Sequence, residues 1–351
     1  MANVEAIRAF YARYITAKGA CRDPRIQKTF SMVEREKYLG PSPWNVYTLT
    51  GYVSTDTSDP AVLYQDILIG LKTDQGINNG EPSLHARCLD AAAISRGESI
   101  THIGSGTGYY TALLAHLTGE TGCVAAYEID PGLSAHVTSN LAHLEHVWVL
   151  EESGTNAVLP RSDLIYVSAG ATHPLNSWLE ALNDGGRLIF PLTPNRGLGG
   201  MLLVTRVASN SYAAKFISPA TFIECVGARD DATGESLVSA FESNTTAAVK
   251  SLRRKTPADK SAWFVGPTGG YRPPRRTISL LTTEVEFPIF DACDRPVWGE
   301  CRPSPMGTDR PTSATRLPRV HRRQSIRVKN SGADTCPALF CPLYSSRTET
   351  S

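Results

Sequence analysis

A glycine-rich turn between a short apolar run and a helical pattern constrains this 351-residue chain more than any other feature. The turn reads Gly104-Ser105-Gly106-Thr107-Gly108. Residues without a Cβ atom allow a tight turn and let a ligand approach the backbone closely. The first N–H groups of the following helix are unpaired and can bind polar or anionic ligand atoms. We therefore predict a nucleotide-type binding site at this strand-to-helix turn.

A carboxylate stands where it can complete this site. Glu128 ends the next apolar run, Cys123–Tyr127, so a parallel sheet would bring it to the same edge as the glycines. A carboxylate there can accept hydrogen bonds from both hydroxyl groups of a ribose. The glycines are spaced as G-x-G-x-G, and Tyr109 stands where a nicotinamide oxidoreductase would need its third glycine. This spacing favours a nucleotide without a pyrophosphate, such as S-adenosylmethionine.

Helical patterns alternate with short β-rich runs after the glycine turn. This order predicts an α/β fold with a doubly wound, mainly parallel sheet. Before the turn, helical spacing predicts an N-terminal helical cap, with helices over 4–15, from Pro24 and over 83–93. The apolar run Val62–Leu71 predicts a strand, and residues 44–61 are expected to be mainly loop with a short strand around Tyr47–Tyr52. Near the end of the core we expect an antiparallel strand pair over 201–207 and 212–217, followed by a helix over 236–250.

Four parts of the chain differ in pattern. We predict an N-terminal helical and substrate-loop region over 1–82, a cofactor-binding core over 83–231, a helical extension over 232–270 and a tail over 271–351. The tail is rich in Pro, Arg, Ser and Thr, and residues 272–351 hold 13 basic and 8 acidic residues. Because it shows no helical or strand periodicity after about Gly270, we expect it to have little order.

The overall composition argues against several classes of partner. The chain is 41% hydrophobic and 20% charged. Its net charge of only +1 gives no overall electrostatic attraction to nucleic acid or to a membrane surface. Its eight cysteines include no C-x-x-C pair, which predicts free thiols and no metal site. We therefore expect a cytoplasmic protein, monomeric, with no nucleic-acid, membrane or metal partner.

Several segments together resemble the protein-L-isoaspartate O-methyltransferase family, a branch of the Rossmann-like methyltransferases that use S-adenosylmethionine. The resemblance extends from Asp23 to about Arg206, roughly half of the chain, and the combination is more specific than any single motif. The segments are Asp23-Pro24-Arg25-Ile26, Val33-Glu34-Arg35-Glu36, His102–Tyr109, Val124–Pro131, Ser162–Ala169 and Leu182–Leu192. It implies a cofactor site formed by Gly104, Ser105, Gly106, Thr107, Gly108, Glu128 and Ser153.

Two positions on the cofactor side depart from this family. Where methyltransferases usually carry an acid two residues before the first glycine, this chain has His102. His102 can still form a hydrogen bond toward the site, or it can be a histidine of the core. Where the family commonly has an aspartate near the adenine, the chain reads Glu151-Glu152-Ser153-Gly154, so Ser153 takes that place and Glu152 could substitute for it.

The loop expected to face the substrate departs further. The family's loop typically reads Gln-Thr-Ile-Ser-Gln-Pro, whereas this chain has the longer Gln75–Pro82, in which the hydroxyl groups are lost. Asn78 takes the place of the family's serine, and we name Asn78 and Asn79 as the candidate catalytic residues because their amides can donate hydrogen bonds. The alternative is that Asn78-Asn79-Gly80 forms only a tight turn.

The resemblance implies a carboxyl O-methyltransferase that acts on isoaspartyl carboxylates in proteins or peptides. A carboxylate is already anionic, so its methylation needs alignment and desolvation rather than a strong base. An alcohol or amine acceptor would need a proton acceptor, for which Glu81, His85 and His173 are candidates. The altered loop motivates one alternative, a same-fold methyltransferase for another carboxylate. His102 and Ser153 motivate a second, a non-catalytic cofactor-binding relative.

Overall fold

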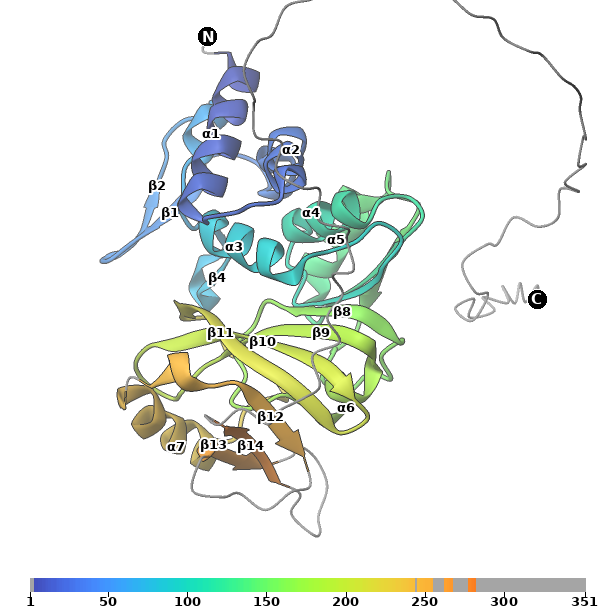
Figure 1. The fold of residues 1–351 in the computed structure, drawn as a ribbon. Helices are drawn as coiled ribbons and strands as arrows, with labels where there is room; N and C mark the ends of the chain where they lie inside the picture. Colours follow the sequence, from blue (N-terminus) through green and yellow to red (C-terminus); the bar gives the residue numbers. More distant parts are fainter. Residues whose placement is uncertain (1–2, 244, 255–261, 268–276, 282–351) are drawn as a thin grey trace, which may run out of the picture. The chain divides into compact units, whose positions relative to one another are not determined.

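A ten-stranded sheet forms the centre of the structure, a computed structural model that describes residues 3–243, 245–254, 262–267 and 277–281 (Figure 1). Its strands are β5 (Ser99–Ile103), β6 (Cys123–Glu128), β7 (Val147–Glu151), β8 (Ser162–Val167), β9 (Leu182–Leu192), β10 (Gly199–Ala208), β11 (Ser211–Ala220), β12 (Ser251–Arg254), β13 (Ala262–Pro267) and β14 (Thr277–Leu281). Their order in the sheet is β13-β14-β12-β11-β10-β9-β8-β5-β6-β7.

The strands β9, β8, β5, β6 and β7 are parallel, and the others extend the sheet by antiparallel pairing. The chain runs from β5 outward to β7 and then returns to the other side of β5 to form β8. The order of connection therefore reverses between β5 and β8. In doubly wound sheets, a crevice for ligands opens at the carboxyl ends of the strands at such a point.

Helices cover both faces of this sheet and match the predicted alternation. One face packs against α1 (Val4–Lys18), α2 (Pro24–Met32), α3 (Pro82–Ala92), α4 (Tyr109–Thr118) and α5 (Pro131–Leu141), and the other against α6 (Asn176–Ala181) and α7 (Asp231–Glu242). Asp23 and Asp130 cap α2 and α5 by accepting hydrogen bonds from backbone N–H groups at 2.9 and 3.0 Å. No helix in the described part of the chain is long and apolar enough to cross a membrane.

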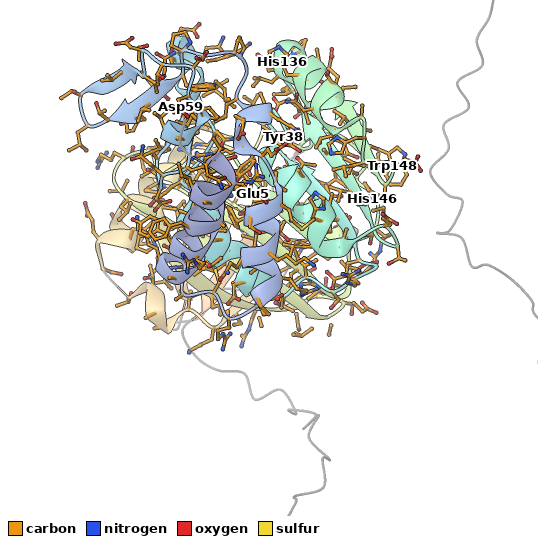
Figure 2. The ribbon with its side chains drawn as sticks, turned by 90° about the horizontal axis from the view of Figure 1, so that it is seen from above. Glu5, Tyr38, Asp59, His136, His146 and Trp148 are labelled. Atoms are coloured by element: carbon orange, nitrogen blue, oxygen red, sulfur yellow. The ribbon has the colours of Figure 1, made fainter. Side chains whose placement is uncertain are left out.

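Alternate residues of the parallel strands supply the two cores. Along β8, Leu164 and Tyr166 pack with the N-terminal helices, whereas Ile165 and Val167 pack with α6 and α7. Both faces are thus apolar, as expected for a parallel sheet that is covered on each side. At the free edge, on β7, Trp148 points outward and is about half exposed (Figure 2).

The predicted strand over Val62–Leu71 is wrong. Its first residues belong to the 3-10 helix Pro60–Leu63, and only its end lies in a strand, β3 (Gly70–Lys72), which pairs with β4 (Ile77–Asn78). Arg35 explains why this segment is not a strand. Its guanidinium donates hydrogen bonds to the carbonyl oxygens of Leu63, Gln65 and Ile67 at 2.7, 3.0 and 2.7 Å. These acceptors are therefore not used by a neighbouring strand.

The loop expected over residues 44–61 contains an antiparallel hairpin. Its strands are β1 (Asn45–Thr48) and β2 (Gly51–Ser54). Trp44 and Ile69 lie beneath it in a small separate core, in which Leu39 and Leu63 are also buried. The short strand expected around Tyr47–Tyr52 is thus a pair of strands with a turn between them, and β1 is also hydrogen-bonded to the segment at Leu68.

The C-terminal part of the described chain also differs from the expectation. The helix predicted over 236–250 ends at Glu242, and three antiparallel strands follow it. One of them, β14, falls inside the segment 271–351 that the sequence predicts to have little order, so that prediction is wrong for Thr277–Leu281. The remainder of that segment, 271–276 and 282–351, lies outside the described residues.

Removing β14 should destabilise the protein, because this strand pairs with both β12 and β13. A chain that ends at Gly270 should melt about 5 °C or more below a chain that ends at Leu281, since 1 kcal/mol shifts the melting temperature of a domain this size by about 2–4 °C. Thermal unfolding of the two chains measures the contribution of β14 directly. Equal melting temperatures would show that β14 does not stabilise the sheet.

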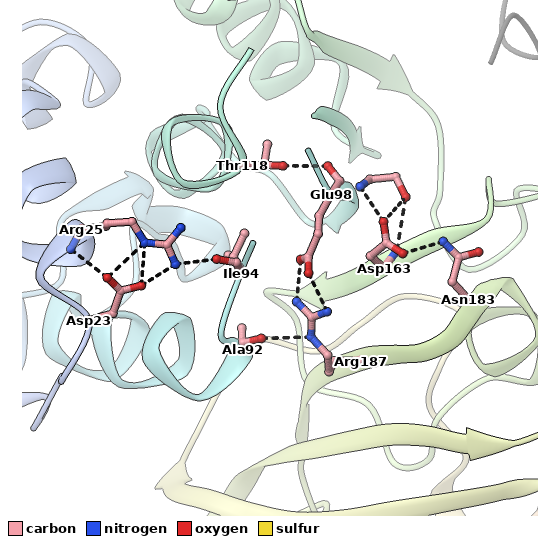
Figure 3. A network of polar contacts seen from close by, with 10 residues as sticks. Asp23, Arg25, Ala92, Ile94, Glu98, Thr118, Asp163, Asn183 and Arg187 are labelled. Atoms are coloured by element: carbon pink, nitrogen blue, oxygen red, sulfur yellow. Dashed lines mark hydrogen bonds and ion pairs between the residues drawn. The ribbon is translucent and has the colours of Figure 1, made fainter. Parts of the chain in front are cut away.

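A polar network fixes the amino ends of the parallel strands (Figure 3). Arg187 forms a two-pronged ion pair with Glu98 at 3.0 and 2.6 Å and donates to the carbonyl oxygen of Ala92. Asp163 accepts hydrogen bonds from the backbone and hydroxyl of Ser99 and from the amide of Asn183. Burial alone would raise the pKa of Asp163, but these donors outweigh it and hold the pKa below its usual range. The first residues of β9 are therefore tied to β5 and β8, at the opposite end of the strands from the glycine turn.

Replacing Arg187 should cost about 2–3 kcal/mol of stability. The variant Arg187→Met leaves the Glu98 carboxylate, only 15% exposed, without its cation. The matched control is Arg196→Met, whose ion pair with Glu235 is 70% and 51% exposed and should contribute less than about 1 kcal/mol. Urea unfolding of both variants tests this, and equal losses would mean that the Glu98–Arg187 pair has no special role.

Candidate functional site

A cleft of about 1230 Å³ opens at the carboxyl ends of β5, β6 and β8. This is the predicted edge of the sheet, at the point where the order of connection reverses. Its lining combines segments that are far apart in the sequence. These are the loop 75–81, residues 102–107 at the end of β5 and in the glycine turn, residues 127–131, residues 152–155, Ser168 and Ala169, and the segment 218–226. We call the part of the lining formed by residues 102–107, 127–131, 152–155, 168 and 169 the cofactor wall. The part formed by the loop 75–81 and the segment 218–226 is the acceptor wall.

The glycine turn has the conformation that its sequence requires. Gly104, Gly106 and Gly108 have φ angles of +76°, +58° and +97°, a region that other residues rarely adopt. The backbone N–H groups of Gly104 and Ser105 donate to the carbonyl oxygen of Tyr127 at 2.9 and 3.1 Å, which ties the turn to β6. The turn is therefore held open toward the cleft by its own backbone.

Glu128 lies at the end of β6, beside this turn. Its two carboxylate oxygens accept hydrogen bonds from the backbone N–H groups of Gly106 at 2.7 Å and Asp130 at 3.0 Å. The side chain is buried, and burial raises its pKa although the two backbone donors act in the opposite direction. Each oxygen still has a lone pair for a ligand hydroxyl, so the carboxylate is both fixed and able to bind.

Two hydroxyl groups of the glycine turn also indicate a ligand site at this place. The Oγ atom of Ser105 and the Oγ1 atom of Thr107 are buried, and neither has a hydrogen-bond partner among the described residues. Buried polar groups are normally paired, so unpaired ones in a cleft indicate a missing ligand. Together with the open turn and Glu128, they fit a nucleoside cofactor such as S-adenosylmethionine.

Ser153 lines the cleft on the far side of β6, as predicted from the sequence. Its hydroxyl lies 2.7 Å from that of Thr155, which in turn donates to the carbonyl oxygen of Val226 at 3.0 Å. Glu152 lines the same part of the cleft. Both residues that could replace the aspartate of the family are therefore at the cleft wall.

His102 combines the two roles that the sequence left open. It is buried in the sheet, and its ring nitrogens bond to the hydroxyls of Thr111 and Ser168 at 2.8 and 3.0 Å. Burial lowers the pKa of His102 to about 3, so the ring is neutral near pH 7. His102 and Ser168 both line the cleft. This position therefore has a neutral polar side chain where methyltransferases usually have an acid.

The loop of the candidate catalytic residues forms the opposite wall. The amide of Asn78 is used within the loop, because its oxygen accepts from the N–H of Gly80 at 3.0 Å and its nitrogen donates to the carbonyl oxygen of Gly76. This is the turn that the sequence allowed as an alternative. Asn79 is buried, with its amide oxygen 3.4 Å from the Arg35 guanidinium, while no partner for its amide nitrogen is found in the described part of the chain.

Of the three candidate proton acceptors, two line the cleft and one does not. Glu81 is at the rim, paired with Lys18 at 3.1 Å, and His85 lies below the loop. His173 is buried outside the cleft lining, next to Thr172. The sequence did not single out Tyr110, Ser168 and Phe222 as cleft residues; for Ser168 its position directly after a parallel strand was the signal that could have found it.

Metal chemistry has no visible basis in this cleft. Over the described residues, no group of three or more His, Cys, Asp or Glu side chains is arranged to hold a metal ion. Asp130, at the rim of the cleft, forms an ion pair with Lys72, which lowers the pKa of that carboxyl.

Solved structures of similar fold support the arrangement of the sheet. A protein-L-isoaspartate O-methyltransferase superposes with a TM-score of 0.54 at 23% identity, covering 67% of this chain and 69% of that one. A protein-L-isoaspartate O-methyltransferase from Plasmodium falciparum, solved with S-adenosyl-L-homocysteine, gives a TM-score of 0.51 at 17% identity over 62% of this chain and 97% of that one.

Sequence comparison gives the same assignment. A protein-L-isoaspartate O-methyltransferase of Brucella anthropi is 24% identical over 229 residues, which are 65% of this chain and 96% of that protein. One from Geotalea uraniireducens is 26% identical over 219 residues, 61% of this chain and 90% of that protein. The profile of the protein-L-isoaspartate(D-aspartate) O-methyltransferase family matches residues 11–230, well over half of the chain. The chain belongs to this family of S-adenosylmethionine-dependent methyltransferases.

Proposed function

We propose that this protein methylates the free carboxylate of isoaspartyl residues in proteins or peptides. The observation that carries the proposal is that one cleft contains both a cofactor wall and a second wall that can receive an acceptor. Its volume of about 1230 Å³ exceeds the 300–1,000 Å³ typical of a site for one small ligand. The cleft therefore has room for a nucleoside cofactor and part of a peptide.

On the cofactor wall, Glu128 would hold the ribose hydroxyls, and Ser105 and Thr107 would supply hydroxyl groups to the rest of the ligand. Gly104 and Gly106 keep the backbone accessible, whereas the predicted cofactor residue Gly108 does not line the cleft and packs against α5. Ser153 would contact the base. S-adenosylmethionine supplies a methyl group on a cationic sulfur atom. A neutral His102 suits such a ligand, because a second positive charge in this buried place would repel it.

On the acceptor wall, the residues would position an anion rather than remove a proton. A carboxylate is a nucleophile without deprotonation, so orientation and exclusion of water supply most of the rate. Asn79 keeps an amide nitrogen that can donate to such a carboxylate, while Asn78 shapes the loop that presents it. Phe222 and Leu198 line the cleft with apolar surface that displaces water.

Replacing Glu128 tests the cofactor wall. Glu128→Ala should weaken the binding of S-adenosylmethionine by about 1–3 kcal/mol, which is roughly 5- to 150-fold in the dissociation constant. Glu151→Ala is the matched control, because Glu151 pairs with Glu128 in the register of β6 and β7 but is exposed and does not line the cleft. Calorimetry should find the control unchanged, and equal affinities for all three proteins would remove Glu128 from the site.

The function itself is tested with a pair of peptides that differ only in the linkage at one residue. Methyl transfer from S-adenosylmethionine should be efficient for the isoaspartyl peptide and near background for its normal aspartyl twin. Transfer to neither peptide, with the cofactor still bound, would favour one of the two alternatives. The lost hydroxyls of the loop 75–82 favour an enzyme for another carboxylate, and a panel of free and C-terminal carboxylates would then identify it.

A further inference from the structure

Two tyrosines on the hairpin β1–β2 (Figure 1) line the cleft and take no part in the core beneath that hairpin. Tyr47 and Tyr52 stand opposite each other in the register of the two strands, and their rings meet edge-to-face with 5.4 Å between centroids. Side chains alternate along a strand, and the neighbouring Val46 packs against the small core that contains Trp44 and Ile69. The two rings, which we call the tyrosine pair, therefore lie on the other face of the hairpin, toward the cleft.

The tyrosine pair is continuous with the acceptor wall. The ring of Tyr52 rests on the backbone of Gly70 in β3, where an added Cβ atom would lie 2.9 Å from the ring. Gly70 is in turn the partner of Asn78 in the register of β3 and β4. Adjacent strands are about 4.8 Å apart, and an extended peptide advances about 3.3 Å per residue. A side chain on the tyrosine pair would thus belong to a residue about two or three positions from a carboxylate held at the loop 75–81.

This end of the cleft is apolar and open to solvent. Tyr47 is 46% exposed, and Leu68 and Leu71 extend the lining beside the tyrosine pair. Of the described residues from Tyr47 to Gly80, none with a charged side chain lines the cleft. Apolar side chains that gather on an open surface mark a binding site, and tyrosine rings give a large contact area at a low cost in side-chain entropy. The surface therefore suits an uncharged, apolar group.

We infer that the tyrosine pair binds an apolar side chain, aromatic or branched aliphatic, of the peptide that carries the acceptor carboxylate. The inference rests on the proposed function and narrows its substrates to peptides with such a residue near the isoaspartyl linkage. The substrate is the occupant because both rings belong to the same cleft as the cofactor wall and adjoin the loop 75–81. The tyrosine pair contributes to substrate binding and takes no part in methyl transfer.

A series of isoaspartyl peptides tests the inference on the unmodified protein. A single Phe is moved through the three positions before and the three positions after the isoaspartyl residue, in a background of Gly and Ser. At one position, or at two adjacent ones, Phe should lower the KM about 10- to 30-fold relative to Ser, because burial of the ring removes apolar surface from water. Lys at that position should give no such gain.

Replacing both rings should abolish this preference. In the double variant Tyr47→Ala/Tyr52→Ala, the KM for the preferred Phe peptide should rise about 10- to 30-fold. The KM for the Ser peptide and the dissociation constant of S-adenosylmethionine should stay within about twofold. Tyr47→Phe/Tyr52→Phe keeps the rings and should keep the preference. Leu49→Ala is the matched control, because Leu49 lies at the tip of the same hairpin, is fully exposed and does not line the cleft.

Several results would overturn the inference while the proposed function stands. One is a KM that is the same for all peptides of the series with the unmodified protein, a measurement that also decides the matter if the alanine variant does not fold. Another is an equal loss for the Phe and Ser peptides in the alanine variant, which would give the rings a structural role only. A dimer that separates in this variant would show that a second copy covers the tyrosine pair. If the unmodified protein methylates no isoaspartyl peptide, the proposed function fails first.

Discussion

Lowering the pH from 7 to 5 should reduce the free energy of unfolding by about 4 kcal/mol, chiefly through His85 and His102. Both rings are buried, and burial lowers the pKa of each from 6.5 to about 3. The folded protein therefore keeps both rings neutral over this range, while the unfolded chain takes up protons below about pH 6.5. Since the unfolded state binds more protons, stability falls with falling pH, by about 2 kcal/mol for each histidine.

Urea unfolding at several pH values tests this expectation. The variant His102→Gln can still bond to Thr111 and Ser168, and it should remove about half of the loss between pH 7 and pH 5. His136→Gln, at an exposed position of α5, should leave the loss unchanged. A stability that stays flat over this range, or an equal slope in His102→Gln, would show that these rings become protonated in the folded protein.

Gly108→Ala should destabilise the protein by about 2–4 kcal/mol, the sum of a strained backbone and a steric clash. The φ angle of +97° is unfavourable for alanine, and its Cβ atom would lie 2.9 Å from Val137 and 3.1 Å from Leu141 of α5. The third glycine of the turn is therefore required for packing of α4 against α5.

Gly106→Ala is the matched comparison within the same turn. Its φ angle of +58° is near the left-handed minimum, and its Cβ atom would meet only Leu71, at an ordinary 3.5 Å. This variant should lose only about 1–2 kcal/mol. Thermal unfolding of both variants gives the difference, and equal losses would mean that α4 and α5 shift to accept the extra methyl group.

Local patterns predicted the parallel half of the fold well. The glycine turn, the Asp23 and Asp130 caps and the alternation of strands and helices follow from contacts close in sequence. The strands after α7 depend on pairing with segments distant in the sequence, and their short runs carry little periodicity. The hydrogen bonds of Arg35 to carbonyl groups of the expected strand 62–71 could not be predicted, because these partners lie 28, 30 and 32 residues farther along the chain.

The residues of the candidate site also fall into those that local sequence patterns predict and those that depend on distant contacts. The positions of Gly104–Thr107, Glu128 and Ser153 at one cleft follow from the rule that ligands bind at the carboxyl ends of parallel strands. The sequence could not show that the amide of Asn78 closes a turn while that of Asn79 keeps a donor, because these differ only in side-chain contacts. The position of His85 depends on its packing against three aromatic rings from separate elements.

The most direct test of the account is a calorimetric titration of the full-length protein with S-adenosylmethionine and S-adenosylhomocysteine. If the cleft at the carboxyl ends of β5 and β6 is a methyl-donor site, both ligands should bind at one site per chain, and Glu128→Ala should weaken both while Glu151→Ala weakens neither. No heat of binding for either ligand at millimolar concentration, with the protein folded, would contradict the account.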